Sequence, residues 1–581
     1  MKIFFKQYLF LLDQKARKQL PMLLFIFLSS SLLDVIGIGL VGAFLLLIVN
    51  FEQVVYKLPA PVQNKINQFS NNEVIVFVGI FLVFAFIFKA FWGIYSQKKV
   101  VSFTSQFAMR LKMRLISGYQ TAAYSFHLRQ NSGYLINKIS TVDSFSNNVI
   151  ATSLSMISSM FVVFGIIASL AVVHPIVTLL LFIMTALVFV CYECFVKNNV
   201  IKLGKTLVMT NGEINKSILQ ALGGIKEIRV LGKENFFLQR ISKLVNQYAY
   251  ASASYNALQL IPRYAVESAA SIFLVALSLG ALFVGTSPVN MIPTLGIFAA
   301  ACIRLLPIVS QLIGQFGQLR SAGYATGVLY DEINALQAQN EAHLSAVHQG
   351  EQHPFSQFSL RNVSFRYSNT NQNALNNIML TLTKGKSIGF MGTSGAGKST
   401  LIGIILGLFS PDLGELLADG LSIKNLRTWL NNFAYIPQSI FLLDDTLKRN
   451  IAMGSDDSEI DMQKLHAAIA MAQLNDVVAN LPQGVDTLIG ENGVLLSGGQ
   501  RQRVALARAF YYEREIIVMD EATSALDNET EREVINAIKQ LHGVKTLIVI
   551  AHRLTTLQYC DVVYKLEKGA IVSQGSYAEI V

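Results

Sequence analysis

A glycine-rich segment in the second half of the chain has the residue types that bind phosphate groups. Its sequence, Gly392-Thr-Ser-Gly-Ala-Gly-Lys398-Ser399-Thr400, fits the pattern G-x-x-x-x-G-K-[ST], in which backbone N–H groups surround phosphates. The segment before it reads as a buried strand and the segment after it as a helix, which is the context that such a loop requires. We expect Lys398 to reach the β- and γ-phosphates of a nucleotide and the Ser399 hydroxyl to bind Mg²⁺. The loop residues expected to contact the nucleotide are Gly392, Ser394, Gly395, Gly397, Lys398, Ser399 and Thr400.

A second glycine-rich turn, Leu496-Ser-Gly-Gly-Gln500, lies about a hundred residues further along. It has no phosphate-binding lysine, so it is not a second loop of the same kind. A turn that opens a helix still presents N–H groups and a hydroxyl to an anion, which predicts phosphate contacts for Ser497, Gly498, Gly499 and Gln500. One nucleotide can therefore be held between the first loop of one copy and the second turn of another.

Acidic residues follow an apolar strand, Glu515-Ile-Ile-Val-Met-Asp520-Glu521. The carboxyl end of a strand beside a phosphate-binding loop is where a metal-bound phosphate lies. Asp520 fits the carboxylate on the Mg²⁺ side, and Glu521 fits the base that orients the attacking water. Asp527 follows in Ser524-Ala-Leu-Asp527 and is expected to contribute to the nucleotide site.

Three further residues are placed to complete a nucleotide site. His552 follows the apolar strand 546–550 and is expected to hold the γ-phosphate. Gln438 follows Tyr435-Ile-Pro437 on a loop. We expect it to sense the nucleotide, to be one of the Mg²⁺ ligands and to contact the apolar first half of the chain. Tyr367 closes a strand-like segment, where it either stacks on adenine or packs as a core tyrosine.

The elements that must carry these residues fall into two halves of different composition. The chain has 581 residues, of which 52% are hydrophobic and only 14% charged, against about 25% charged in soluble proteins. Residues 1–325 consist of long apolar runs separated by basic stretches, whereas 355–581 read as an α/β domain. The net charge of +10 lies beside the apolar runs, as membrane topology requires, and this argues against nucleic-acid binding.

Six apolar stretches are long enough to cross a bilayer, which takes about 20 residues. They lie near 21–49, 73–95, 149–173, 175–196, 257–285 and 291–316. The connections 96–148 and 197–256 hold 7 and 9 Lys plus Arg residues, whereas the external connections hold only Lys57 and Lys65. This asymmetry predicts that both long connections and both termini are cytoplasmic.

The long connections are poor in Gly and Pro, so we expect the spans to continue beyond the bilayer as helical rods. Near their tips, 124–129 and 224–231 are short amphipathic segments, predicted either to contact the ATPase half or to form ordinary turns. The external segment 62–69 is either a short surface helix or a plain loop.

Cations inside the spans are the candidates for cargo binding, because a charge at the bilayer centre costs about 2.5–3.5 kcal/mol or more. They are Lys89, Arg263 and Arg304, of which Arg304 lies nearest mid-span. The alternatives are a cavity that meets an anionic cargo, and snorkelling or internal pairing, for instance of Arg263 with Glu267.

Two other groups of residues have side chains that can bind metals, but their positions favour structural roles. Cys191 and Cys194 form a C-x-x-C inside an apolar run with no second ligand pair, so we interpret them as packing residues. His343, His348 and His353 are spread around a helix by their spacing of five, which indicates a solvated linker instead of a metal site. The first apolar run is too long for a cleavable signal and is interpreted as a permanent span.

With these motifs in order, the chain resembles an ABC transporter of the exporter type over essentially its whole length. The resemblance rests on Gly392–Thr400 (Walker A), Gln438 (Q-loop), Leu496–Gln500 (signature), Ile516–Glu521 (Walker B), Ser524–Asp527 (D-loop) and His552 (H-loop). The segment Thr487–Gly493 resembles the exporter loop that contacts the transmembrane rods. The resemblance implies ATP and Mg²⁺ as cofactors, hydrolysis with Glu521, and a homodimer of twelve spans with two shared ATP sites.

Within that family, 223–237 and 261–267 most resemble the PglK-type flippases of lipid-linked oligosaccharides. This resemblance implies a cargo with a pyrophosphate between polyprenyl and sugar, which cationic cavity residues would meet. The other cargoes that fit an exporter are lipid A-like glycolipids, peptides and drugs. Because no peptidase-like domain precedes the first span, exporters of leader peptides are less favoured.

The sequence thus predicts an α-helical membrane domain followed by an α/β P-loop ATPase domain. We expect a transmembrane domain at 1–329, a linker at 330–357 and an ABC ATPase domain at 358–581. The expected function is an ATP-driven flippase in the bacterial inner membrane, with membrane lipid and a second copy as partners. A soluble, DNA-associated ATPase of the SMC type is excluded by the spans and by the absence of long coiled coils. An ATP-gated channel remains an alternative function. Measuring vectorial, ATP-dependent movement of a cargo against passive ion current would distinguish a transporter from a channel.

Overall fold

The chain forms two compact units. The computed structural model describes residues 2–49, 51, 69–283, 288–340, 354–367, 370–423, 426–520, 539, 541–550 and 554–580. The first unit comprises 1–122 and 128–341, and the second comprises 123–127 and 342–581. The division near 341 falls inside the predicted linker 330–357, of which 330–340 belong to a helix.

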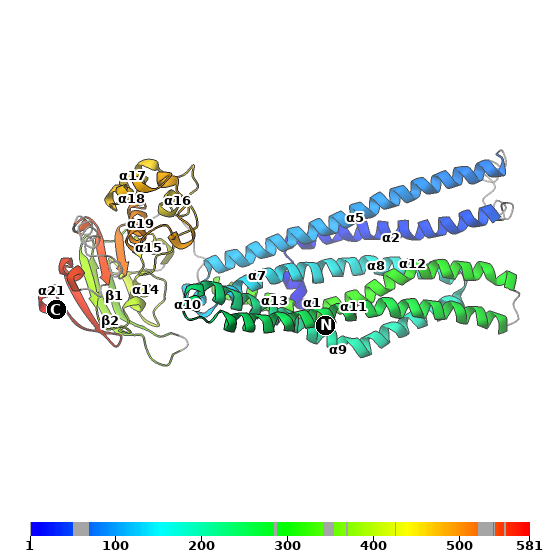
Figure 1. Cartoon of the computed structure of the whole chain (residues 1–581), viewed down its shortest axis with the longest axis horizontal. Helices are drawn as coiled ribbons and strands as arrows, with labels where there is room; N and C mark the ends of the chain where they lie inside the picture. Colours follow the sequence, from blue (N-terminus) through cyan, green and yellow to red (C-terminus); the bar gives the residue numbers. More distant parts are fainter. Residues whose placement is uncertain are drawn as a thin grey trace. The chain divides into compact units, whose positions relative to one another are not determined.

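The first unit is built of long helices (Figure 1). In chain order they are α1 (Lys2–Leu11), α2 (Gln14–Val49), α5 (Asn71–Thr121), α7 (Ser132–Phe145), the π-helix η1 (Ser146–Ala151), α8 (Thr152–Val173), α9 (Pro175–Gly223), α10 (Ile225–Val230), α11 (Glu234–Phe283), α12 (Pro288–Ser321) and α13 (Gly323–Asn340). The short α6 (Tyr124–Arg129) follows α5. The six predicted spans fall on α2, α5, α8, α9, α11 and α12, apart from positions outside the described residues.

Among the described residues, four helical segments are long and apolar enough to cross a membrane. They are Asn71–Thr121, Ser132–Val172, Pro175–Gly223 and Glu234–Gly280. The first and sixth predicted spans lie on α2 and α12, of 36 and 34 residues. The predicted external segment 62–69 lies outside the described residues except for Phe69.

The prediction that spans continue as helical rods is confirmed. Helices α5, α9 and α11 have 51, 49 and 50 residues, which at 1.5 Å per residue gives about 75 Å each, against about 30 Å of hydrocarbon. Ser70 and Glu73 form a capping box at the start of α5. At the predicted tight turn, α8 ends at Val173 and Pro175 occupies the first position of α9.

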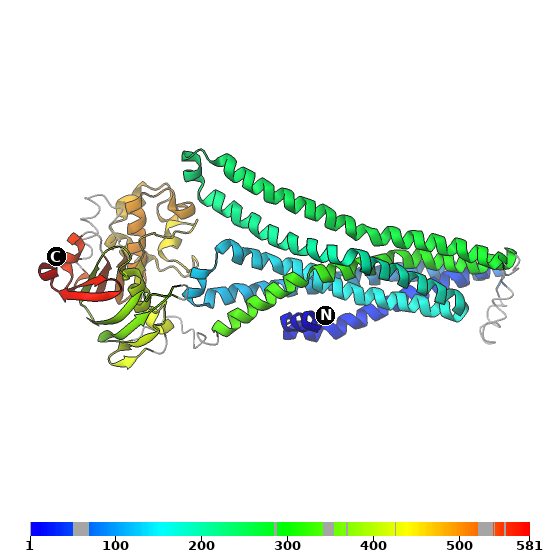
Figure 2. The ribbon, with the colours of Figure 1, turned by 90° about the horizontal axis from the view of Figure 1, so that it is seen from below.

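Side chains of α8, α9, α11 and α12 form the apolar core of this unit. One cluster includes Ile166, Leu181, Phe273 and Phe298, all less than 10% exposed. Figure 2 shows α9 and α11 running alongside one another, and α12 packs against both. Gly204 of α9 permits close packing, because a Cβ there would lie 2.6 Å from the Cβ of Ser321.

Two ion pairs join distant parts of the helical unit. Lys138 of α7 is paired with Glu332 of α13, and both side chains are only 7% exposed. Glu193 of α9 is paired with Arg320 of α12. The pairing of Arg263 with Glu267, which the sequence suggested as one alternative, is not present, although both residues are among those described.

The second unit contains two β-sheets. The larger has the strand order β10–β9–β3–β8–β7–β6, and all its neighbouring strands are parallel except β9 and β10. Its strands are β3 (Ser387–Met391), β6 (Phe433–Ile436), β7 (Ile516–Asp520), β8 (Thr546–Ile550), β9 (Val562–Glu567) and β10 (Ala570–Gly575). The smaller, antiparallel sheet has the order β2–β1–β4–β5, from β1 (Gln357–Phe365), β2 (Leu375–Thr383), β4 (Leu413–Ala418) and β5 (Leu421–Ser422).

Helices complete this unit on both faces of the larger sheet. They are α14 (Lys398–Ile405), α15 (Leu426–Leu430), α16 (Leu447–Ile451), α17 (Met462–Met471), α18 (Asn475–Asn480), α19 (Gly498–Tyr511) and α21 (Tyr577–Ile580), with the 3₁₀ turns η2 (Gly484–Asp486), η3 (Glu491–Gly493) and η4 (Leu554–Tyr559). Along β7, Ile516 and Val518 pack in the core that contains α14, whereas Ile517 and Met519 pack in the core that contains α19. This alternation is that of a strand buried on both faces.

The short segment 123–127 groups with the second unit by its contacts. Within that unit, the ring of Tyr124 lies 5.6 Å from the ring of Phe409. The sequence offered contact with the ATPase half or an ordinary turn for 124–129, and residues 124–127 of this segment group with the second unit.

Candidate nucleotide site and membrane pockets

The loop between β3 and α14 depends on glycine at two positions. Gly392 has a φ of +154°, and a Cβ there would lie 2.4 Å from the carbonyl oxygen of Leu566. Gly397 has a φ of +101°, and a Cβ would lie 2.8 Å from the carbonyl oxygen of Ala374. Larger residues would therefore push the loop off the strands that support it.

Lys398 is folded back onto the loop that it follows. Its Nζ donates to the carbonyl oxygens of Gly392 at 2.7 Å and Thr393 at 3.1 Å, and the residue is 7% exposed. Lys398 and Ser399 open α14, where the first N–H groups of a helix have no partner within it. This is the arrangement of an anion site: free helix N–H groups beside a lysine held by neutral carbonyls that a phosphate can replace.

Three neighbouring strands bring the acidic end of β7 to the level of this loop. Phe390 of β3 is paired with Ile550 of β8, and Ile550 is paired with Asp520 of β7. The loop begins two residues after Phe390, so it starts at the same sheet edge as the Asp520 carboxylate. The structure thus brings together the phosphate-binding loop and the first predicted acidic residue.

The Asp520 carboxylate accepts a hydrogen bond from the hydroxyl of Tyr435, whose oxygen lies 3.1 Å from Oδ2. Burial raises the pKa of Tyr435, and the negative charge of Asp520 raises it further, so the hydroxyl stays protonated as a donor. The hydroxyl of Ser399 and the carboxylate of Asp520 are oxygen ligands, which fit Mg²⁺. In the described part of the chain, no group of three or more His, Cys, Asp or Glu side chains is placed to hold a metal ion.

Tyr367 contacts the same loop through its hydroxyl, which is hydrogen-bonded to that of Thr400 at 3.0 Å. Its ring packs edge-on against Phe365 and Phe409, at 5.1 Å and 5.8 Å between centroids. The ring is half-buried in this aromatic group, so both roles offered for Tyr367, adenine stacking and core packing, retain support.

The signature turn is held at the N-terminus of α19 by two reciprocal hydrogen bonds. The Ser497 hydroxyl accepts from the backbone N–H of Gln500 at 3.2 Å, and the Gln500 side chain accepts from the N–H of Ser497 at 2.8 Å. Leu496 is buried in the core that contains α19, whereas Ser497 is exposed. The turn therefore presents its serine and glycines at the surface of a rigid helix start.

Two backbone hydrogen bonds hold the segment 487–493 beside the start of α16. The N–H of Leu447 donates to Thr487 and the N–H of Ile489 donates to Asp445, at 3.0 Å and 3.1 Å. Leu488, between them, is 60% exposed. An exposed leucine on a fixed backbone suits the predicted contact with the transmembrane rods, which stays a prediction.

Several predicted site residues are not described by the structure. Glu521, Asp527 and His552 lie outside the described residues, as do the linker histidines at 343, 348 and 353. Glu521 directly follows the end of β7, and His552 follows the end of β8 by two residues. Gln438 is exposed and follows the end of β6 by two residues.

Of the three cations proposed for cargo, Arg304 lines a pocket of about 280 Å³ in the helical unit. Ser158 and Ser159 of α8 lie on its other side, with Pro307 and Ile308 beside the arginine on α12. The two hydroxyls and the guanidinium give the pocket a polar, cationic lining at a membrane position.

The other two cations do not line this pocket. Lys89 lies on α5, where its Nζ would be 3.5 Å from a Cβ at Gly37 of α2 and lies 5.8 Å from the centre of the Phe86 ring. Arg263 follows Pro262 on α11 and is exposed. Of the three, the sequence favoured Arg304, which lies nearest mid-span, and Arg304 is the one that lines this pocket.

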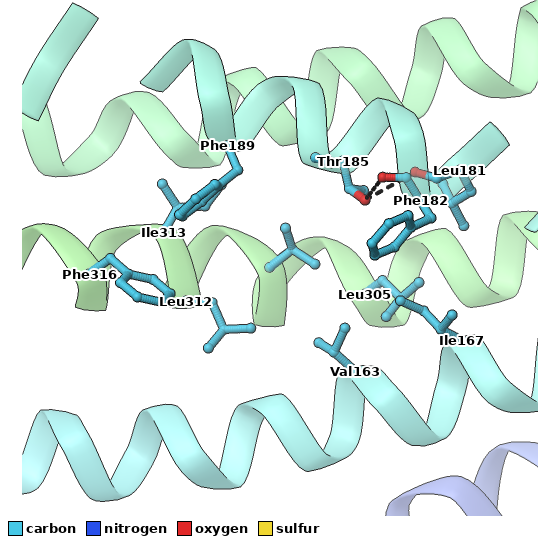
Figure 3. A pocket seen from close by; sticks show the side chains of 12 residues that line it. Val163, Ile167, Leu181, Phe182, Thr185, Phe189, Leu305, Leu312, Ile313 and Phe316 are labelled. Carbon is cyan, nitrogen blue, oxygen red and sulfur yellow. Dashed lines mark hydrogen bonds between the residues drawn. The ribbon is translucent and has the colours of Figure 1, made fainter. Parts of the chain in front are cut away.

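An apolar pocket of about 200 Å³ lies between α8, α9 and α12 (Figure 3). Figure 3 shows Val163 and Ile167 of α8, Phe182 and Phe189 of α9, and Ile313 among the side chains around it. The hydroxyl of its one polar residue, Thr185, donates to the carbonyls of Leu181 and Phe182 and so offers no free donor to the pocket.

Sequence reasoning missed the residues that act through another side chain. Tyr435 was noted only as a neighbour of Gln438, although its place near the end of a strand beside β7 was a usable signal. Ser158 and Ser159 carry no signal of their own in an apolar run. Glu193 and Arg320 pair across 127 residues of sequence, and no local pattern indicates this pairing.

Both halves of the chain match models of one protein family. Residues 38–303 match the ABC transporter transmembrane region, and residues 375–524 match the ABC transporter family. The second match includes the loop 392–400, Gln438, the signature turn and Asp520.

Relatives and solved structures resemble nearly the whole chain. The ATP-dependent lipid A-core flippases of Yersinia pestis and of Escherichia coli (strain K12) are each 27% identical over 518 residues, covering 88% of this chain and 87% of theirs. A bacterial Atm1-family ABC exporter with ATP bound matches with a TM-score of 0.78 at 20% identity, covering 98% of this chain and 96% of its own. The chain is therefore an ABC exporter, in which a helical transmembrane domain is fused to an ABC ATPase domain that hydrolyses ATP to drive transport.

Proposed function

We propose that this exporter is a flippase that moves an anionic glycolipid of the lipid A-core type across the bacterial inner membrane. The similarity to curated lipid A-core flippases over most of both chains supports this cargo class. The sequence had favoured a lipid-linked oligosaccharide and given a lipid A-like glycolipid as the alternative. The relatives support that alternative better.

The observation that carries the proposal is the placement of Arg304 opposite Ser158 and Ser159. A guanidinium is always charged and binds phosphate through two parallel hydrogen bonds, and hydroxyls add further donors. Placing an arginine in a membrane span costs about 2.5–3.5 kcal/mol or more, a cost that an arginine in a solvated loop does not carry. The position of Arg304 in a span therefore favours a functional role. The pocket of about 280 Å³ suits a phosphate group at the junction of sugar and lipid.

The apolar pocket suits the hydrocarbon part of the same cargo. It uses α8 and α12, the two helices that also form the Arg304 pocket, and Leu305 of its lining is the neighbour of Arg304. With no polar group free to face inward, the pocket favours a hydrocarbon chain. A cargo with both a phosphate and acyl chains fits the pair of pockets.

A lipid-linked oligosaccharide is the second candidate. The stretches 223–237 and 261–267 resemble PglK-type flippases, and the pyrophosphate of such a cargo would suit Arg304 equally well. Arg263 lies in the second stretch but outside the Arg304 pocket. The two cargoes therefore share anion chemistry and differ in the number and length of their hydrocarbon chains.

We propose that two copies couple ATP to this movement as a homodimer. Lys398 would exchange its carbonyl partners for the phosphates of ATP, while Ser497 and Gly499 of the other copy contact the γ-phosphate. Bound Mg²⁺, held by Ser399 and Asp520, would neutralise phosphate charge. Glu521 would orient the attacking water. Binding energy drives the change of access only because ATP favours the closed pair of ATPase domains over the open pair.

Cargo-stimulated ATP hydrolysis in nanodiscs tests the cargo. We expect lipid A-core glycolipid to stimulate the parent, and Arg304→Ala to lose this stimulation while keeping its basal rate. Arg263→Ala is the matched control, because it removes a guanidinium from a span outside the pocket, and it should retain stimulation. Stimulation by lipid-linked oligosaccharide but not by lipid A-core glycolipid would favour the second candidate. Full stimulation of Arg304→Ala by lipid A-core glycolipid would contradict the role of the pocket.

A further inference from the structure

The end of β6 and the end of β7 place two side chains on the same face of the larger sheet. Strands β6 and β7 are parallel neighbours, with Tyr435 paired to Val518. Phe433, two residues before Tyr435, and Val518, two residues before Asp520, both pack in the core that contains α14. Because side chains alternate along a strand, Tyr435 and Asp520 point to this same face.

The contact between these side chains is a directed hydrogen bond. The Tyr435 hydroxyl donates to Oδ2 of Asp520 at 3.1 Å. Tyr435 is 43% exposed, whereas the other residues of β6 are less than 10% exposed. Packing of the core therefore does not account for a tyrosine here, and its hydroxyl has a specific acceptor.

We propose that Tyr435 is a positioning residue for Asp520 in the nucleotide site. A carboxylate that is to hold a metal ion needs a fixed orientation, and a hydrogen bond to one oxygen leaves the other directed at the ion. The residue acts through Asp520 and not on the nucleotide. Its role concerns the ATPase reaction, so it stands whichever cargo the exporter moves.

The test measures metal binding apart from turnover. Mn²⁺ replaces Mg²⁺ as a probe, and its binding to the full-length protein with saturating non-hydrolysable ATP analogue is followed by electron paramagnetic resonance. Tyr435→Phe should weaken Mn²⁺ binding by about tenfold, the lower end of the effect of losing such a partner. Binding of a fluorescent ATP analogue in EDTA should not change, because the phosphate-binding loop is untouched.

A matched control separates this role from the loss of any tyrosine hydroxyl. The Tyr512 hydroxyl donates to the backbone carbonyl of Met453 at 2.5 Å and not to Asp520. Tyr512→Phe should leave the Mn²⁺ affinity at the parent value. In hydrolysis, Tyr435→Phe should raise the Mg²⁺ concentration at half-maximal rate and keep kcat within about twofold at saturating Mg²⁺, because the reacting groups remain.

A double-mutant cycle with Asp520→Asn decides whether the effect passes through Asp520. In that background, adding Tyr435→Phe should change Mn²⁺ affinity by less than about twofold. The proposal is overturned by equal Mn²⁺ affinity in the parent and Tyr435→Phe. It is also overturned by an undiminished effect of Tyr435→Phe in the Asp520→Asn background. Thermal melting of each variant confirms that the protein compared is folded.

Discussion

Ser497 and Gln500 hold each other at the start of α19, each side chain accepting a hydrogen bond from the other residue's backbone N–H. The serine predicted to meet a γ-phosphate is thus engaged with its own helix. A hydroxyl oxygen that accepts from an N–H can still donate its own proton. Ser497 can therefore keep its cap and donate to a phosphate from the other copy.

A mixture of two inactive variants tests whether the nucleotide sites are shared between copies. Lys398→Ala removes the phosphate-binding lysine and Ser497→Arg blocks the signature turn, so each variant alone should lose ATP hydrolysis. In a mixed dimer, the intact Lys398 of one copy faces the intact Ser497 of the other. An equal mixture should recover up to about a quarter of the parent ATPase rate, since half of the dimers are mixed and each has one intact site.

The control for that mixture is each variant reconstituted alone at the same total concentration. A site built within one copy would leave every chain with one damaged half. A mixture no more active than its components would therefore contradict sharing between copies.

Breaking the buried ion pair between Lys138 and Glu332 should destabilise the helical unit strongly. Both side chains are 7% exposed, so Glu332→Gln leaves the lysine charge buried without its counterion. The expected cost is about 3–5 kcal/mol, visible as a lower thermal midpoint of the detergent-solubilised protein.

A paired replacement provides the control. Lys138→Met with Glu332→Leu removes both charges and keeps similar volumes, so its midpoint should lie close to that of the parent. A double variant as unstable as Glu332→Gln would show that the pair itself, and not the stranded charge, supplies the stability.

Asp561 should make the stability of the ATPase domain depend on pH. Burial alone would raise its pKa, but hydrogen bonds from the N–H and hydroxyl of Ser387 and from Lys386 outweigh this and lower it. A lowered folded pKa means that this stability is present above the unfolded value, about 3.9, and is lost as pH falls through the folded value.

The corresponding measurement is the thermal midpoint of the parent and of Asp561→Asn from pH 8 to pH 3. The parent should be more stable than Asp561→Asn above about pH 5, and the margin should begin to shrink near the unfolded pKa of about 3.9 and be smallest at pH 3. A margin that stays the same at pH 3, or that grows on acidification, would contradict the assigned direction.

Much of the nucleotide site could be predicted, because its motifs are local in sequence. The loop 392–400 carries its own glycines and lysine, and parallel strands bring their carboxyl ends to one edge, which places Asp520 beside it. The long apolar runs likewise predicted the helices of the membrane domain and their extension into rods.

Contacts between residues far apart in the sequence could not be predicted. The partner of Lys138 is 194 residues away, and no periodicity links α7 to α13. Lys89, Arg263 and Arg304 were all cargo candidates because hydropathy gives depth in a span but not which helix faces which. Tyr435 could be predicted only in part. Strand alternation predicts which face of the sheet its side chain occupies, but not that its hydroxyl donates to Asp520.

If ATP hydrolysis moves an anionic glycolipid through the helical domain, flipping of a fluorescent lipid A-core glycolipid in proteoliposomes should require ATP. We predict ATP-dependent movement by the parent and by Arg263→Ala, none by Glu521→Gln although it still binds ATP, and a loss of at least about tenfold in Arg304→Ala, because a charged hydrogen-bonding partner is removed. Movement that does not require ATP, or undiminished movement in Arg304→Ala, would rule out ATP-driven transport of this glycolipid past Arg304.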